Sequence, residues 1–321
     1  MAEFKLINQF INRVEVDSSV VLGIGDDAAV LDVPPGFQII QTMDTMVENV
    51  HFDERFSADA LAHKLLHVNL SDIAAMGGFP KWATVALTMP SVNSDQHVAW
   101  LDEFSRGLQS RSAELDLNLV GGDTTSGPLS VSMNLTGLVE SGRFITRHNA
   151  KSDDDIYVSG HLGDAALALT EQGYDNPDLI KRLLYPQARL HLGEKLYDIA
   201  NACLDISDGL LADLTHICRS SHVFAQINVE KIPVSTAYQR FFQDQIDLDF
   251  ALNGGDDYEL CFTASISQRE KVQLLSQQVG HQITRVGKIT KRPYHDDEEP
   301  IALLFNNRLY HCKRKGWEHF A

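Results

Sequence analysis

The sequence predicts an α/β protein of two domains, in which strands and helices alternate in an α+β arrangement. Three observations support this prediction. The chain has 321 residues, which is enough for two domains of ordinary size. Short β-rich runs alternate with stretches of helical periodicity along the chain. A change of composition at residues 149–155 marks the expected boundary, so we assign residues 1–148 to one domain and residues 149–321 to the other.

The N-terminal half opens with a predicted amphipathic helix, because apolar residues recur at helical spacing from Phe4 to Val14. The same periodicity predicts helices over residues 57–76 and 94–115, the first of them stopped by Gly77-Gly78. Runs rich in β-branched and other apolar residues predict the strands, at residues 20–25, 28–33, 37–43, 82–89, 118–120 and 130–139.

The C-terminal half repeats this rhythm. Helices are predicted up to about residue 201, from Asp208 onward, and from Ser267, where Ser-Gln-Arg-Glu has the pattern of a capping box. The acidic run 153–155 has the character of a solvated linker. Predicted strands lie at residues 155–160, 202–206, 225–229, 251–253 and 258–263. Both halves contain Gly-Gly-Asp, which hints at two domains of related design.

Charge and composition exclude several classes of function. The 27 basic and 44 acidic residues give a net charge of −17, which repels a phosphate backbone, so we expect no nucleic-acid partner. No apolar run approaches the roughly 18 residues of a membrane span, and the first residues lack a signal-peptide core. The four cysteines are far apart, as free thiols of a reducing compartment are. We therefore expect a soluble, cytoplasmic protein.

Aspartates collect where predicted strands and helices give way to loops. These are Asp26 and Asp27 after Gly25, Asp44, Asp72, Asp123 after Gly121-Gly122, Asp205 and Asp208 around Ser207, and Asp256 and Asp257 after Gly254-Gly255. Turn formation explains any one of them, and Ser207 could cap the helix that starts at Asp208. Their joint occurrence points to a site. Asp72 is the most informative, because it falls late in an apolar helical stretch, where a carboxylate is costly unless it is paired or binds a cation.

Oxygen ligands without histidine or cysteine partners favour Mg²⁺, whose coordination is usually completed by substrate phosphates. Glycine-rich turns beside the aspartates let backbone N–H groups approach those phosphates. The sequence therefore predicts a magnesium-dependent enzyme that acts on the phosphates of a nucleotide.

Other motifs are weaker or absent. The chain has no GxxxxGK[ST] loop, no kinase HRD or DFG, and no GxSxG elbow that would make Ser207 a nucleophile. Residues 23–28 match the dinucleotide pattern GxGxxA, but two carboxylates would face the pyrophosphate and a strand follows instead of a helix. His63 and His67 are spaced to bind zinc on one helix face, but no third ligand is evident, so packed or solvated histidines are favoured.

A resemblance adds to this interpretation. In order along the chain, GIGDDAAVL, TMDTMVENVHF, NLSDIAAMGG, LVGGDTTSGPLS, GRFITRHNAK, DISDGLLADL, GGDDYELCF and KGWEHF resemble the thiamine-monophosphate kinase family, within the aminoimidazole ribonucleotide synthetase-like superfamily. The resemblance implies the two-domain fold of that superfamily. It also implies that the N-terminal ATP- and metal-binding domains pair in a homodimer, and that the C-terminal domain completes the active-site cleft.

The resemblance also implies site residues. Those implied as magnesium ligands are Asp27, Thr42, Met43, Asp44, Asp72, Asp123, Asp205 and Asp208. Those implied as ATP contacts are Gly122, Asp123, Arg147 and Ser207, and those implied as thiamine-phosphate contacts are His51, Asp256 and Trp317. The catalytic set drawn from these is Asp27, Asp72, Asp123, Arg147 and Asp208. We expect several Mg²⁺ ions, with K⁺ as a further candidate ion.

Two positions depart from the family pattern. Met43 stands where a threonine or serine is usual, so it can offer a metal only its backbone carbonyl. Asp256 stands where glutamate is usual and is one methylene shorter, which puts its substrate contact in question.

The implied reaction is the ATP-dependent phosphorylation of thiamine monophosphate to thiamine diphosphate by direct in-line transfer. Arg147 and Lys64 are expected to steady the transferred group. The alternatives are another ATP-dependent synthetase of the superfamily, a metal-dependent phosphatase, or a nucleotide-binding regulator without turnover. Formation of ADP that requires a phosphorylated acceptor distinguishes the kinase from the last two.

Overall fold

The computed structural model describes residues 16–90, 95–243, 245–292, 295 and 298–313. The chain divides into two compact units, residues 1–73 with 78–142 and residues 74–77 with 143–321. The assignment of functions to domains 1–148 and 149–321 stays a prediction. In the described part of the chain, no helix is both long enough and apolar enough to cross a membrane.

In its described residues, the first unit contains two long helices and two sheets, whose strands are mostly antiparallel. Its elements are β1 (Val20–Leu22), β2 (Val30–Leu31), β3 (Phe37–Val47), α2 (Ala58–Ala75), β4 (Phe79–Met89), α3 (Asp95–Glu114), β5 (Asn118–Ser126) and β6 (Ser130–Glu140). Strands β1 and β2 form one sheet, and the other has the order β3-β6-β4-β5, in which only β4 and β5 run parallel.

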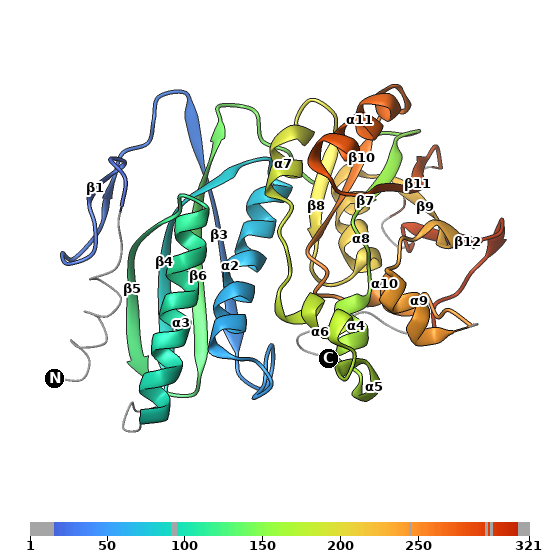
Figure 1. The fold of residues 1–321 in the computed structure, drawn as a ribbon. Coiled ribbons are helices and arrows are strands. Elements are labelled where there is room, and N and C mark those ends of the chain that lie inside the picture. The colour runs from blue at the N-terminus through green and yellow to red at the C-terminus, as the bar shows by residue number, and fades with distance from the viewer. Residues whose placement is uncertain (1–15, 91–94, 244, 293–294, 296–297, 314–321) are drawn as a thin grey trace. The chain divides into compact units, whose positions relative to one another are not determined.

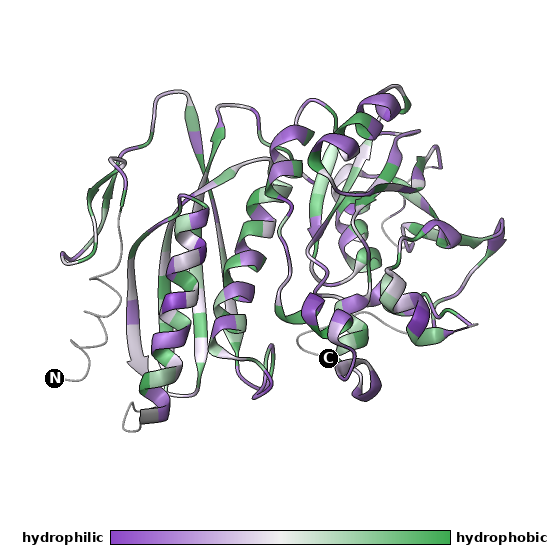
Figure 2. Ribbon diagram, viewed as in Figure 1, coloured by the Kyte–Doolittle hydropathy of each residue, from purple (hydrophilic) through white to green (hydrophobic). Residues whose placement is uncertain are grey.

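Among the described residues, one face of the four-stranded sheet packs against helices and the other does not. Figure 1 shows α2 and α3 on the same face, and purple and green alternate along α3 in Figure 2, as in an amphipathic helix. Along β6, Val131, Met133 and Leu135 are buried, whereas Ser132 and Asn134 between them are only half-buried. This alternation places the first unit's core between sheet and helices.

The second unit is built on a seven-stranded sheet of order β13-β12-β9-β11-β7-β10-β8. Its strands are β7 (Asp155–Ser159), β8 (Ala202–Ile206), β9 (Phe224–Asn228), β10 (Glu259–Ala264), β11 (Ile283–Thr290), β12 (Ile301–Phe305) and β13 (Arg308–Leu309). Its helices are α4 (Asp164–Ala168), α5 (Glu171–Tyr174), α6 (Pro177–Leu184), α7 (Leu190–Leu196), α8 (Leu210–Ser221), α9 (Thr236–Phe242), α10 (Asp249–Asn253) and α11 (Arg269–Val279).

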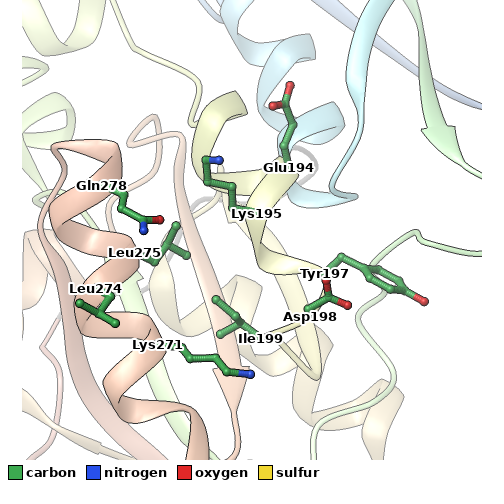
Figure 3. Close-up of a pocket in the computed structure, with 9 residues that line it drawn as sticks. All are labelled: Glu194, Lys195, Tyr197, Asp198, Ile199, Lys271, Leu274, Leu275 and Gln278. Atoms are coloured by element: carbon green, nitrogen blue, oxygen red, sulfur yellow. The ribbon is translucent and has the colours of Figure 1, made fainter.

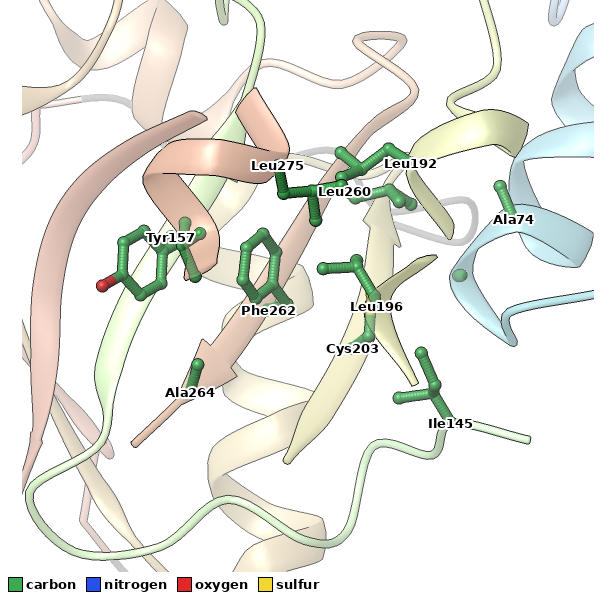
Figure 4. Close-up of a cluster of buried hydrophobic side chains, with 12 residues drawn as sticks. Ala74, Ile145, Tyr157, Leu192, Leu196, Cys203, Leu260, Phe262, Ala264 and Leu275 are labelled. Atoms are coloured by element: carbon green, nitrogen blue, oxygen red, sulfur yellow. The ribbon is translucent and has the colours of Figure 1, made fainter. Parts of the chain in front are cut away.

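Aromatic and aliphatic side chains from the sheet and from α7 and α11 form a buried cluster in this unit (Figure 4). The rings of Tyr157 on β7 and Phe262 on β10 stack with centroids 5.2 Å apart. Leu196 of α7 and Leu275 of α11 pack against the same cluster. This cluster fixes strands β7 and β10 and the edge strand β8, and therefore also the loop that leaves β8.

Long periodic segments were predicted correctly. Helices α2 and α3 agree with the predicted 57–76 and 94–115 within about two residues, and the strand after the GxGxxA pattern is confirmed as β2. The predicted N-terminal helix lies outside the described residues. Strand β5 is longer than predicted and carries Gly121, Gly122 and Asp123 within it.

Four local predictions were wrong. Residues 251–253 end helix α10, since a three-residue apolar run does not distinguish a strand from a buried helix. Helix α8 begins at Leu210 with Gly209 as its N-cap residue, so Ser207 caps nothing. The Ser267 capping box does not form, because a 3₁₀ turn over Ile266–Gln268 precedes α11.

The fourth wrong prediction is the solvated linker at 153–155. Asp154 and Asp155 are both buried. Asp154 accepts from Lys151 N and from Asn201 Nδ2, each at 2.9 Å, and Asp155 pairs with Arg269 and Arg285. Asn201, Arg269 and Arg285 lie far away in sequence, which is why charge patterning alone suggested a solvated run.

Candidate active site

Two carboxylates meet on the helix side of the first unit's sheet. Thr42 Oγ1 on β3 donates a hydrogen bond to Asp72 Oδ2 on α2. Burial, and then the negative charge of Asp72, raise the pKa of Asp44 to about 6. The sequence predicted all three residues as ligands, and the structure brings their oxygen atoms into one neighbourhood. Two acidic groups and a hydroxyl suit a hard divalent cation such as Mg²⁺.

Gly122 and Asp123 lie on β5, at the other edge of the same sheet. A Cβ atom on Gly122 would lie 2.0 Å from the backbone carbonyl oxygen of Val85, so only glycine fits against β4 there. Asp123 is exposed.

The register shows that Asp123 and the Asp44–Asp72 pair lie on opposite faces of the sheet. Asp123 is aligned across the strands with Ala86, Ser132 and Thr45, and this row is on the face without helices. Asp44 is aligned with the buried Met133, on the helix face. Three strand spacings of about 4.8 Å also separate β3 from β5, a distance of roughly 14 Å. One copy of the first unit therefore does not bring Asp123 to the carboxylate pair.

The remaining candidates of the first unit lie on loops. Asp27 lies exposed between β1 and β2, where its backbone N–H donates to Asp26 Oδ1 at 2.9 Å. His51 follows β3, and its Nδ1 accepts a hydrogen bond from the backbone N–H of Val47 at 3.1 Å. That bond fixes the orientation of the imidazole ring. Lys64 is buried, and its ammonium lies 5.6 Å from the ring centroid of Phe56, so its role in steadying the transferred group stays a prediction.

In the second unit, the candidate residues gather on the loop between β8 and α8. Asp205 is buried within β8, and Ser207 and Asp208 are partly exposed beyond it. One oxygen of Asp213, Oδ2, accepts from the backbone N–H groups of Ser207, Asp208 and Gly209, at 3.0, 3.1 and 3.1 Å. These N–H groups therefore point into the protein, and the expectation that this turn offers them to a phosphate is wrong.

A second loop, residues 254–258, packs directly on the first. The backbone N–H of Asp256 donates to Ser207 O at 2.9 Å, and that of Tyr258 donates to Ile206 O at 2.8 Å. A Cβ atom on Gly255 would lie 2.3 Å from Ser207 O, so the loops touch through backbone. Asp256 has a φ of 67°, and its Oδ1 accepts from the Tyr258 hydroxyl at 2.9 Å. A left-handed aspartate held in this way is typical of a functional position.

Arg147 is exposed and lies in the same electrostatic neighbourhood as Asp208. Burial and the Arg147 charge lower the pKa of His216, on α8, against the opposing effect of Asp208. Ser221 Oγ anchors the Arg147 backbone carbonyl at 3.0 Å. The second unit therefore presents a cation beside its acidic loop.

Three residues of this neighbourhood were missed from the sequence: Asp213, His216 and Tyr258. Asp213 gave a usable signal, since it is an acidic residue in the first turn of a helix that follows Ser-Asp-Gly. Burial and the charge of Asp208 raise its pKa to about 7, against the three N–H donors. The substrate residue Trp317 lies outside the described residues.

Other possible sites have weaker support. In the described ranges, no group of three or more histidine, cysteine, aspartate or glutamate side chains is gathered as a preformed metal site. His63 and His67 stack with centroids 4.1 Å apart, and His63 Nδ1 accepts from Arg111 Nε at 3.0 Å, as packed histidines do. The four cysteines are free thiols, as predicted. A hollow of about 380 Å³ between α7 and α11 contains none of the predicted site residues (Figure 3).

Known proteins share this sequence and fold. The family model described as AIR synthase related protein, N-terminal domain, matches residues 25–139. Over 327 residues, 98% of each chain, the protein is 38% identical to the thiamine-monophosphate kinase of Haemophilus influenzae. The crystal structure of thiamine-monophosphate kinase from Stenotrophomonas maltophilia is 39% identical, with a TM-score of 0.85 over 97% of this chain and 98% of that one. The structure of AaThiL complexed with AMPPCP and TMP is 28% identical, with a TM-score of 0.76 over 99% and 96%.

Proposed function

The chain belongs to the thiamine-monophosphate kinase family, and we propose that its reaction, the ATP-dependent phosphorylation of thiamine monophosphate to thiamine diphosphate, proceeds by direct in-line transfer. The observation that carries this function is similarity over nearly the full length of both chains. It is supported by the relative solved with AMPPCP, an ATP analogue, and TMP.

The acceptor defines what the protein must do. A phosphate monoester has a second pKa near 6, so at pH 7 thiamine monophosphate is mostly a dianion that attacks without a strong general base. The enzyme must instead hold two polyanions together and align them. A carboxylate-rich site does this only with cations, so Mg²⁺ is the group that supplies charge neutralisation when bound.

The residues of the first unit fit such an ion. Thr42, Asp44 and Asp72 offer oxygen atoms only, and the pKa of Asp44 is raised by its burial and then by the negative charge of Asp72 nearby. We propose these three, with the Met43 carbonyl and Asp27, as magnesium ligands on that side. In the second unit, Asp205 and Asp208 are proposed as ligands, Ser207 as an ATP contact, and Arg147 as the cation that steadies the transferred group. K⁺ remains a candidate activating ion.

The geometry of the sheet supports a homodimer. Asp123 lies on the face without helices, so it serves the same nucleotide as Asp44 and Asp72 only if two copies associate. On the same face of β3, Ile39 and Met43 are 53% and 61% exposed, which gives this surface an apolar component. We propose that two such sheets pair, and that each site takes Asp123 from the partner subunit.

We propose that the phosphoryl acceptor, thiamine monophosphate, is bound by His51, Asp256 and Trp317. The hydrogen bonds that hold His51 Nδ1 and Asp256 Oδ1 support preorganised contacts at these two positions. Asp256 is shorter than the family glutamate, but its strained backbone presents it from the 254–258 loop. Free thiols and the need for ATP support a cytoplasmic reaction.

The test is mass spectrometry of the products after incubation with ATP, Mg²⁺ and either thiamine monophosphate or free thiamine. We expect thiamine diphosphate and ADP in equal amounts from the monophosphate, no product from thiamine, and no turnover in EDTA. Phosphorylation of free thiamine at a similar rate would contradict the assignment. Release of inorganic phosphate without thiamine diphosphate would indicate a phosphatase instead.

A further inference from the structure

Asp213 has a role in the structure that the sequence resemblance does not assign. It lies in the first turn of α8, is 5% exposed, and directs one carboxylate oxygen at three consecutive N–H groups of the loop 207–209. Because three N–H groups that are consecutive in the chain converge on one oxygen, the orientations of these peptide groups are fixed together, and the loop has a single shape.

That shape determines which groups of the loop face outward. Because the N–H groups of Ser207 and Asp208 are turned toward Asp213, their side chains remain on the partly exposed side. The loop is also confined from behind, since a Cβ atom on Gly209 would lie 2.7 Å from the carbonyl carbon of Asn253. The contact between Ser207 O and Asp256 N passes this constraint on to the neighbouring loop.

We propose that Asp213 is a positioning residue for phosphoryl transfer, which holds Ser207 and Asp208 in the orientation that binds the metal-bound nucleotide. This inference rests on the proposed function, in which those two side chains contact ATP and Mg²⁺. The simpler alternative is that Asp213 only stabilises the N-terminus of α8 through the helix dipole.

A matched pair of variants separates the two roles. Asp213→Asn keeps the size of the side chain, replaces the charged acceptor with a neutral amide, and turns one oxygen into a donor. Asp154→Asn is the same substitution at a buried aspartate that also accepts a backbone N–H. Asp154 is hydrogen-bonded to Asn201, which precedes the first residue of β8, whereas Ser207 follows the last residue of β8. The control residue therefore lies at the opposite end of that strand from the loop 207–209.

The readout is calorimetric binding of AMPPCP with Mg²⁺ to the full-length protein, beside a thermal melt. We expect Asp213→Asn to raise the Kd for AMPPCP at least tenfold, and Asp154→Asn to change it less than twofold at a comparable loss of Tm. An unchanged Kd in Asp213→Asn, whatever its Tm, overturns the positioning role.

If Asp213→Asn does not fold, Asp213→Glu takes its place, since it keeps the charge but moves the acceptor by one methylene. A Kd within twofold of wild type in that variant overturns the proposal. Because nucleotide binding needs no thiamine monophosphate, a wild-type protein that binds AMPPCP but makes no thiamine diphosphate would refute the proposed function and leave this inference standing.

Discussion

At the scale of single residues, burying carboxylates close to like charges costs free energy. Asp44 and Asp72 come from a strand and a helix, and burial together with the negative charge of Asp72 raises the pKa of Asp44 to about 6. Elsewhere the structure offsets such costs fully, as at Glu259, which is completely buried and bonded to Arg189, Arg182 and Ser159. This contrast fits our proposal that the first pair binds a cation, whereas Glu259 serves the structure.

Asp72→Asn tests the first of these statements. The variant should lose turnover by at least about 100-fold, because it removes charge that a metal would neutralise. The Tm of the metal-free protein should be unchanged or higher, since repulsion with Asp44 falls. Steady-state kinetics and thermal melts measure both, with Asp102→Asn on the solvent side of α3 as a control that keeps full activity. Near wild-type activity in Asp72→Asn at moderate Mg²⁺ removes this residue from the site.

Glu259→Gln tests the buried ion pair through its pH dependence. Burial alone would raise the pKa of Glu259, but the hydrogen bond from Arg189 and the charges of both arginines outweigh it, and the pKa is lowered. A lowered folded pKa gives stability that is complete above the unfolded value near 4.3 and is lost as the pH falls through the folded value.

The variant should therefore lose about 3–5 kcal/mol at pH 7, because Arg189 is left buried beside a neutral amide. The Tm gap to wild type should stay constant from pH 6 to 8 and narrow below about pH 4. Thermal melts of both proteins across this range give the answer, and a gap that is independent of pH would show that Glu259 does not contribute through its charge.

At the scale of elements, prediction from sequence succeeded where many residues carried one period. The burial of the α2 face, and with it the placement of Asp72, follows from an apolar pattern over eighteen helical residues. The prediction of secondary structure failed at 251–253 and 267–270. In each segment only three or four residues carry the local pattern, and tertiary contacts determine the structure instead. The prediction also missed the end of β5, because Gly121-Gly122 signals a turn locally while β4 holds the segment extended.

Gly122→Ala tests that packing of β5 on β4. A new Cβ would lie 2.0 Å from Val85 O, so the strands must separate, at a cost of about 1–3 kcal/mol for an overpacked position. The neighbouring Gly121→Ala is the matched control, since its Cβ would meet only Thr84 Cγ2, at an ordinary 3.5 Å. Urea unfolding of both variants measures the difference, and equal stabilities would mean that the β4–β5 approach is not restrictive.

At the scale of the whole molecule, the motifs predict a set of site residues but not how these residues are arranged in space. Strand order and register place Asp123 on the face of the sheet opposite to Asp44. Neither property is encoded locally, because both depend on which strands pair across the sheet. The same holds for Asp213, whose importance depends on the three N–H groups that converge on it. The sequence therefore predicts the chemistry of the site better than its assembly.

Mixing two inactive variants tests the assembly directly. In the proposed homodimer, each site combines Asp44 and Asp72 of one subunit with Asp123 of the partner subunit. A heterodimer of Asp72→Asn and Asp123→Asn copies then has one site that carries both changes and one that carries neither. If subunits pair at random, half of the dimers are mixed and about a quarter of wild-type activity should return.

The two variants are unfolded and refolded together at equal concentration, and dimer formation is confirmed by size-exclusion chromatography. Each variant refolded alone gives the baseline, which should stay inactive because both of its sites carry the same change. If every site were complete within one chain, each site in the mixture would still contain a substitution, and no activity would return. Recovery therefore requires that Asp123 acts across the dimer, as we propose from its position on the helix-free face of the sheet.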